Sequence, residues 1–150
     1  MKRINFYRSG DPYGEFSNFY KNEVNIDGKK YKTTEHYFQA MKYKDDKTYF
    51  DKICNTSSPS EAAALGRSRN KPIRKDWEKV KDGIMLKALR AKFTQNEILK
   101  KLLVSTSDAI LVEHTQNDKY WADGGNDTGL NMLGKLLMQV RTQLSNENSE

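Results

Sequence analysis

The chain has 150 residues, of which 36% are apolar and 31% are charged, and its formal net charge is +6 at pH 7. This length supports one domain that buries a core without disulfides, and the single cysteine, Cys54, excludes an intramolecular disulfide. No run of about 18 apolar residues is present and the first residues lack a secretory signal, so we expect no membrane segment and a cytoplasmic location.

The first part of the chain predicts short strands and then a helix. Residues 4–7 have the composition of a short strand, and residues 23–32 predict a hairpin that turns at Asp27-Gly28, a dipeptide typical of tight turns. A helix is expected from about Thr34 to Lys44, because a threonine cap precedes apolar residues at helical spacing. The hairpin therefore leads directly into this helix.

The remainder of the chain predicts mostly helix. The expected elements are a helix from a Ser58 cap to Gly66, a helix from an Asp76 cap to about Phe93, a helix at 97–103, a strand at 109–112, and a last helix with an apolar stripe at Leu133, Leu137, Val140 and Leu144. A polar tail begins at about residue 145. We therefore expect a single α+β domain, 1–150, that is rich in helix and has a small antiparallel sheet.

The predicted helix at 34–44 carries three chemical groups on one face. At about 100° per residue, the Glu35 carboxylate, the Gln39 amide and the Lys42 amine lie along one stripe. A carboxylate and an amine held on a packed helix are what proton transfer or covalent attack at a carbonyl-like carbon requires. The same spacing also fits a solvated helix face, in which Glu35 only stabilises the helix N-terminus.

Two further segments suit an anionic ligand. Arg67, Arg69 and three more cations lie within nine residues, up to Lys75, a density that fits either a phosphate site or a solvated loop. Residues 120–131 form a glycine-rich loop before the last helix, where backbone amides favour an anion and Trp121 can stack on a base. Taken alone, a tryptophan in such a loop is more often a packing residue.

Six sequence blocks occur in a fixed order along the chain: 14–19 (GEFSNF), 35–40 (EHYFQA), 88–93 (ALRAKF), 111–115 (LVEHT), 120–125 (YWADGG) and 131–138 (NMLGKLLM). They resemble the blocks of YbiA-like proteins in the NADAR family, and the similarity extends from about residue 4 to 144. Members of this family look like N-glycosidases. The resemblance implies cleavage of the ribosyl bond of early riboflavin-pathway intermediates or, as in other branches, removal of ADP-ribose from guanine.

The resemblance also implies site residues, and it reverses the solvated interpretation of Glu35. It makes Glu35 and Lys42 catalytic, with Glu35 the more secure of the two. The implied substrate-binding residues are Asn18, Gln39, Arg67, Arg69, Trp121, Asp123 and Asn131. Two histidines and one cysteine provide no usual zinc spacing, so we predict no metal and no cofactor.

Two mechanisms and one main alternative function remain open. Glu35 acts as general acid or base in an oxocarbenium-like cleavage, or Lys42 captures C1 as a Schiff base while Glu35 moves protons. The expected partner is a small phosphoribosyl or ADP-ribosyl substrate, and nucleic acid enters only as an ADP-ribosylated guanine substrate because no reader motif is evident. The alternative is a non-catalytic module that binds a nucleotide or ADP-ribose.

Overall fold

The computed structural model describes residues 2–148, and these contain α-helices and two short sheets. In chain order the elements are β1 (Arg3–Phe6), the 3₁₀ helix η1 (Gly14–Phe16), β2 (Val24–Ile26), β3 (Lys29–Tyr31), α1 (Thr34–Met41), α2 (Lys47–Cys54), α3 (Pro59–Arg67), α4 (Trp77–Gln95), α5 (Glu97–Ser105), β4 (Ile110–Glu113) and α6 (Met132–Asn148). The predicted α+β class is confirmed. Among the described residues, no helix has the length and apolar character needed to cross a membrane.

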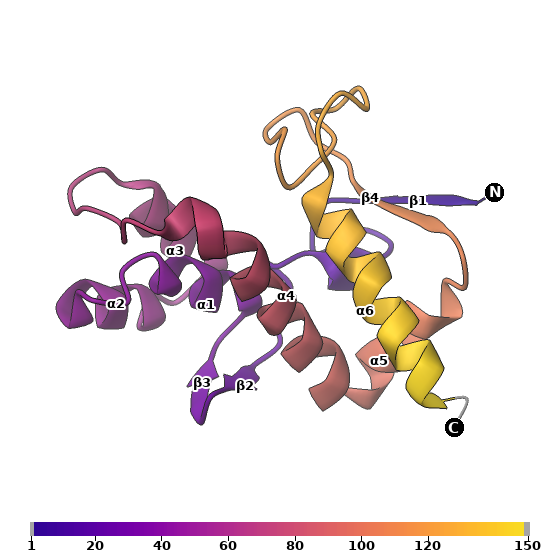
Figure 1. The fold of residues 1–150 in the computed structure, drawn as a ribbon, viewed down its shortest axis with the longest axis horizontal. Coiled ribbons are helices and arrows are strands. Elements are labelled where there is room, and N and C mark those ends of the chain that lie inside the picture. Colours follow the sequence, from indigo (N-terminus) through magenta and orange to yellow (C-terminus); the bar gives the residue numbers. More distant parts are fainter. Residues whose placement is uncertain (1, 149–150) are drawn as a thin grey trace.

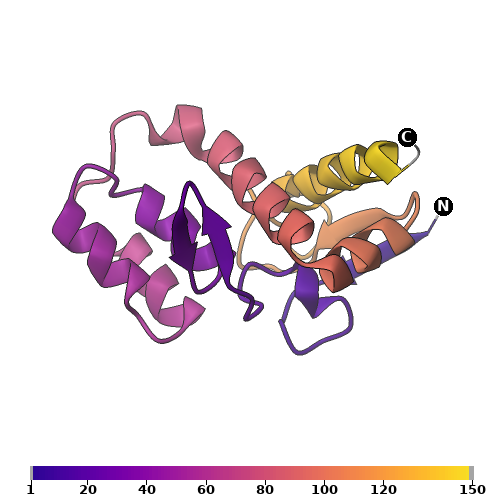
Figure 2. The ribbon, with the colours of Figure 1, turned by 90° about the horizontal axis from the view of Figure 1, so that it is seen from below.

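Helix α4 runs through the middle of the molecule (Figure 1). It packs against α1 on one side and against α6 on the other. Helices α1, α2 and α3 lie toward one end of the molecule, whereas β1, β4, α5 and α6 lie toward the other end (Figures 1 and 2). Segments from both groups therefore meet beside α4.

The strands form two separate sheets. Strands β2 and β3 are antiparallel, and Asp27 and Gly28 at their turn have φ values of 54° and 83°, which a tight type I′ hairpin requires. The hairpin prediction is therefore confirmed. Strands β1 and β4 pair in parallel, with Ile4 opposite Leu111, and this second sheet was not predicted. Because α1 to α5 lie between the two strands, no local sequence signal pairs them.

Side-chain caps fix several helix starts at the predicted positions. Thr33, Ser58 and Asn96 accept backbone hydrogen bonds at the N-termini of α1, α3 and α5, as is typical of such caps. Asp46 caps α2 in the same way, although that helix was not predicted. Helix α1 ends at Met41, three residues before the expected end.

The predicted apolar stripe of the last helix is confirmed. Leu133, Leu137, Val140 and Leu144 are all buried, and they pack into the main hydrophobic cluster together with residues of β1, α4 and β4. Helix α6 continues to Asn148, and residues 149–150 of the predicted polar tail lie outside the described residues.

Helix α4 carries a buried lysine that was not predicted. Lys92 is 1% exposed, and its Nζ donates a 2.8 Å hydrogen bond to the backbone oxygen of Ser17. Burial lowers the pKa of Lys92 to about 7, because a charged amine is poorly solvated in the core. The lysine thus fastens the segment 17–19 onto α4.

We expect Lys92→Met to change how stability depends on pH. The folded-state pKa of Lys92 is lowered, so between about pH 7 and the ordinary lysine pKa of 10.5 the unfolded chain binds more protons than the folded one. The contribution of Lys92 to the free energy of unfolding therefore increases as pH rises through this window and decreases as pH falls. Urea unfolding at several pH values measures this effect, and the free energy of unfolding of the wild type minus that of Lys92→Met should increase from pH 7 to pH 10. An equal difference at all pH values would contradict this account.

Candidate active site

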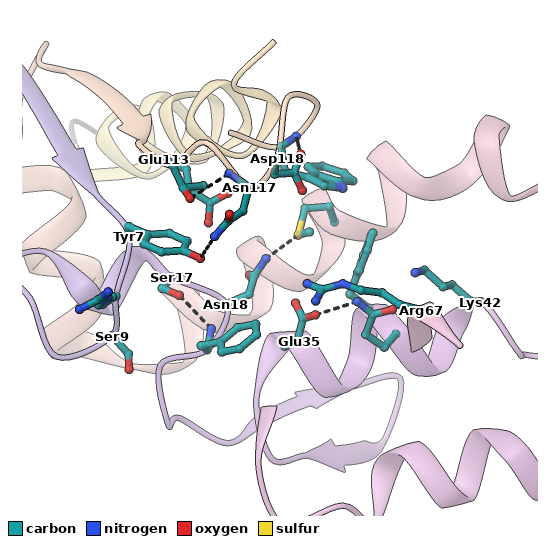
Figure 3. Close-up of a pocket in the computed structure, with 17 residues that line it drawn as sticks. Tyr7, Ser9, Ser17, Asn18, Glu35, Lys42, Arg67, Glu113, Asn117 and Asp118 are labelled. Carbon is teal, nitrogen blue, oxygen red and sulfur yellow. Dashed lines mark hydrogen bonds between the residues drawn. The ribbon is translucent and has the colours of Figure 1, made fainter. Parts of the chain in front are cut away.

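A pocket of 760 Å³ lies between the two groups of elements, beside α4 (Figure 3). One wall comes from α1 and α3, with Glu35, Phe38, Gln39, Lys42 and Arg67. The facing wall comes from the end of β4 and the loop after it, with Glu113, Thr115, Asn117, Asp118 and Trp121. Residues 7–9, residues 17–19 and Met85 of α4 complete the lining. The pocket therefore collects polar side chains from segments that are distant in the sequence.

Helix α1 is buried from Thr34 to Ala40, which places the predicted carboxylate and amide inside the protein. Glu35 is 6% exposed, and its Oε2 accepts a 2.7 Å hydrogen bond from Gln39 Nε2. Burial raises the pKa of Glu35, while the Gln39 bond and the charges of Arg67 and Lys42 act in the opposite direction. The solvated interpretation of this helix face is therefore wrong for Glu35 and Gln39.

Lys42 lies at the C-terminal cap of α1 and also lines the pocket. Its Nζ donates a 3.4 Å hydrogen bond to the Gly66 oxygen and lies 5.9 Å from the centre of the Phe38 ring and 5.8 Å from that of Trp77. Burial lowers the pKa of Lys42, while the Glu35 charge opposes that change. A lowered pKa increases the fraction of neutral amine, the form that attacks carbon.

Asn18 lines the pocket, and it also locks segment 17–19 against the start of α1. Its Oδ1 accepts a 2.7 Å hydrogen bond from Thr34 Oγ1, and its backbone oxygen accepts one of 3.2 Å from the Glu35 N–H. The Asn18 Nδ2 donates to Met85 Sδ at 3.4 Å. Asn18 therefore fixes the position of the helix start that carries Glu35.

The cationic side chains of residues 67–75 do not lie together in the structure. Arg67, the last residue of α3, lines the pocket. Arg69 is exposed and is not among the lining residues. Arg74 pairs with Asp76 at 2.6 Å, which holds it at the start of α4. Of the two predicted phosphate contacts, the geometry therefore favours Arg67.

Asp123 and Asn131 lie behind the pocket wall and do not line the pocket. Asp123 Oδ1 accepts a 3.1 Å hydrogen bond from the Thr115 N–H, and its Oδ2 pairs with His114 Nδ1 at 2.6 Å. Asn131 Oδ1 accepts a 3.0 Å bond from the backbone N–H of Glu113. Both side chains therefore support the loop and the strand end that form the wall.

Trp121 also lines the pocket. Its ring makes edge-on contacts with Phe38 at 5.3 Å and with Tyr120 at 4.9 Å between ring centres. The Trp121 backbone N–H also donates a 2.8 Å bond to Asp118 Oδ1. These contacts hold the indole in one orientation beside the cavity.

Sequence reasoning missed the acids of the facing wall. Glu113 ends β4 and Asp118 lies in the loop, and Figure 3 shows both across the pocket from Glu35. Burial raises the pKa of Glu113 to about 8, and the charges of Asp118 and Glu35 act in the same direction. A sequence signal was present, because Glu113 is an acid that directly follows the apolar strand residues 110–112.

The fold and the site define an α+β protein with a polar, partly buried pocket and several perturbed titratable groups, as is typical of an enzyme that acts on a small polar ligand. The chain belongs to the NADAR family, because the NADAR domain matches its residues 5–145.

Three relatives illustrate this membership. N-glycosidase YbiA of Shigella boydii serotype 4 (strain Sb227) is 56% identical over 144 residues, which cover 96% of this chain and 89% of that protein. The NMR structure of the E. coli protein YbiA matches with a TM-score of 0.91 and 54% identity, covering 99% of this chain and 88% of that chain. Riboflavin biosynthesis protein PYRR, chloroplastic, of Zea mays is 37% identical over 155 residues, which cover 94% of this chain and 25% of that protein.

Proposed function

We propose that the chain is an N-glycosidase that hydrolyses the bond between C1 of a ribose 5-phosphate and the nitrogen of a heterocyclic amine, with early riboflavin-biosynthesis intermediates as substrates. The observation that carries this proposal is the buried Glu35–Gln39 pair beside the Lys42 amine in one pocket. The names of the Shigella and maize relatives support the reaction and the substrate class.

Glu35 is suited to move protons at C1. Burial raises the pKa of Glu35 above that of an ordinary carboxyl, which makes its carboxylate a stronger base. Gln39 holds the carboxyl in one orientation by donating to Oε2. Asn18 fixes the helix start through the Glu35 N–H.

Lys42 is suited to covalent attack on a sugar whose ring has opened. Ring opening gives an imine between C1 and the amine nitrogen, and the neutral Lys42 amine adds to C1 and expels the heterocyclic amine. Water then hydrolyses the new Schiff base, which releases ribose 5-phosphate and restores Lys42. Direct displacement by water, assisted by Glu35, is the competing route.

Trp121 and Arg67 supply the two ends of the substrate site. The indole stacks on the heterocycle, since aromatic faces bind bases without the need for hydrogen bonds. The Arg67 guanidinium binds the 5′-phosphate, for which its fork of donors is suited. Both residues line the same pocket as the reacting groups.

We expect Arg67→Ala to raise KM at least about tenfold for a 5′-phosphorylated substrate and to change KM little for its dephosphorylated analogue, because a charge-assisted bond to phosphate is lost. Arg69→Ala is the matched control, since Arg69 is exposed on the same segment outside the pocket lining. Steady-state kinetics of both variants with both substrates measure the effect. Equal losses for the two substrates would show that Arg67 does not bind the phosphate.

The proposed function is tested by comparing substrates. Purified protein is incubated with 5-phosphoribosylaminopyrimidines and, separately, with ADP-ribosylated guanosine, and the released base is quantified by liquid chromatography. We expect a higher kcat/KM for the phosphoribosylaminopyrimidine. A preference for ADP-ribosylated guanosine would assign the chain to the other reaction, and tight binding without any release would make it a binding module.

A further inference from the structure

The carboxyl of Glu113 is held across the pocket from Glu35 by a rigid backbone. The Glu113 N–H donates to Asn131 Oδ1 at 3.0 Å, and its backbone oxygen accepts a 3.0 Å bond from the Asp123 N–H. The parallel ladder places Glu113 opposite Phe6. Because these contacts fix the backbone at the end of β4, the Glu113 side chain has a defined direction into the cavity (Figure 3).

The surroundings of Glu113 are mainly acidic. The charges that act on its carboxyl are those of Asp118, Glu35 and Asp123. The other titratable groups that line the pocket are Tyr7, Arg8, Lys42 and Arg67. Within residues 2–148, no side chain forms an ion pair with the Glu113 carboxyl or donates a hydrogen bond to it. Burial raises the pKa of this carboxyl to about 8, so it carries a proton at neutral pH.

Burial raises the pKa of Glu35 as well, but the groups around its carboxyl differ from those around Glu113. Gln39 donates directly to its carboxylate, and the charges of Arg67 and Lys42 favour the ionised form. Two carboxyl groups in one site, whose neighbours favour opposite protonation states, divide into an acid and a base. The division here makes Glu113 the acid and Glu35 the base.

We propose that Glu113 is the general acid that protonates the departing amine nitrogen, while Glu35 carries the proton released by Lys42. The proposal rests on the proposed function and assigns it a further catalytic residue. As the C1–N bond breaks, the imine nitrogen of the open-chain substrate gains one proton from Lys42 through Glu35 and one from Glu113.

The same assignment accounts for every proton in the second half-reaction, the hydrolysis of the Lys42 Schiff base. The departure of the amine leaves C1 joined to Lys42 as a protonated Schiff base and leaves Glu113 ionised. Water adds to C1, and one of its protons returns to Glu113 while the other completes the Lys42 amine. Substrate and one water therefore give ribose 5-phosphate and the free amine, and all three side chains regain their starting protonation.

The test is the pH dependence of kcat/KM for wild type and Glu113→Gln with a phosphoribosylaminopyrimidine between pH 5.5 and 9.5. We expect the wild-type rate to fall above about pH 8, where Glu113 loses its proton. Glu113→Gln should lower the rate at pH 7 about a hundredfold and remove that fall. Glu97→Gln, an exposed acid at the start of α5, is the control and should keep the wild-type profile.

The outcomes separate this proposal from the proposed function. A wild-type protein that releases no amine would overturn both. A wild-type protein that turns over while Glu113→Gln retains the rate, or retains the fall above pH 8, would overturn the acid role alone. A ¹³C NMR titration of the wild-type carboxyl groups is independent of turnover and of the folding of the variant. We expect one glutamate carboxyl of the wild type to titrate near pH 8, and its signal to be missing from the spectrum of Glu113→Gln. A wild-type spectrum in which no glutamate titrates near pH 8 would contradict the assignment.

Discussion

Glu35→Gln lowers kcat by about a hundredfold or more, a loss of about 2.7 kcal/mol in transition-state stabilisation. Glutamine has the size of glutamate, and its oxygen can accept the hydrogen bond that Gln39 donates, but it cannot exchange a proton. Because burial raises the pKa of Glu35, the folded state loses stability as pH rises and this carboxyl ionises. The variant should therefore melt at the same temperature as the wild type or higher at neutral pH.

Single-turnover kinetics and thermal melting of Glu35→Gln measure these two effects together. The exposed Glu97→Gln variant is the control for the loss of one carboxylate. Wild-type turnover in a folded Glu35→Gln protein would remove Glu35 from the mechanism. A large loss of melting temperature would instead indicate that Glu35 holds the structure of α1.

Lys42→Arg abolishes turnover if the Schiff-base route operates. A guanidinium remains protonated at all accessible pH values and cannot attack C1, whereas the lowered pKa of Lys42 provides a neutral amine. Borohydride added during turnover should trap a ribosyl adduct on the peptide that contains Lys42 in the wild type. The arginine variant should show no adduct by mass spectrometry.

Activity that survives in Lys42→Arg, or product that accumulates without any trapped adduct, would favour direct attack by water. Lys42 would then act as a positive charge that favours ionisation of Glu35, a role that arginine can fill. Lys81→Arg is a useful control, because Lys81 is outside the pocket lining and forms an ion pair with Glu78.

The parts of the site that lie on one helix could be predicted from the sequence. Glu35 and Gln39 are four residues apart, so helix geometry alone brings their side chains together, and the structure places them 2.7 Å apart. The capping residues Thr33 and Ser58 were predictable for the same reason, since a cap contacts only the first turn of its own helix. Sequence spacing within one helix was therefore enough to predict these contacts.

The facing wall could not be predicted in the same way. Glu113 reaches the pocket only because β4 pairs in parallel with β1, and no local pattern specifies a partner strand so distant in the chain. Arg67 and Arg69 are similar in sequence context, yet only Arg67 lines the pocket, because it ends α3 where that helix packs against α1. Asn131 was predicted as a substrate contact, and its hydrogen bond to Glu113 places it behind the wall.

The most direct test of the central claim is a ³¹P and ¹H NMR measurement of the products formed from a phosphoribosylaminopyrimidine. The account predicts that wild-type protein forms ribose 5-phosphate and free aminopyrimidine in equal amounts and over many turnovers, and that Glu35→Gln forms neither at a comparable rate. Saturable binding of the substrate with no appearance of ribose 5-phosphate, or equal product formation by wild type and Glu35→Gln, would contradict it.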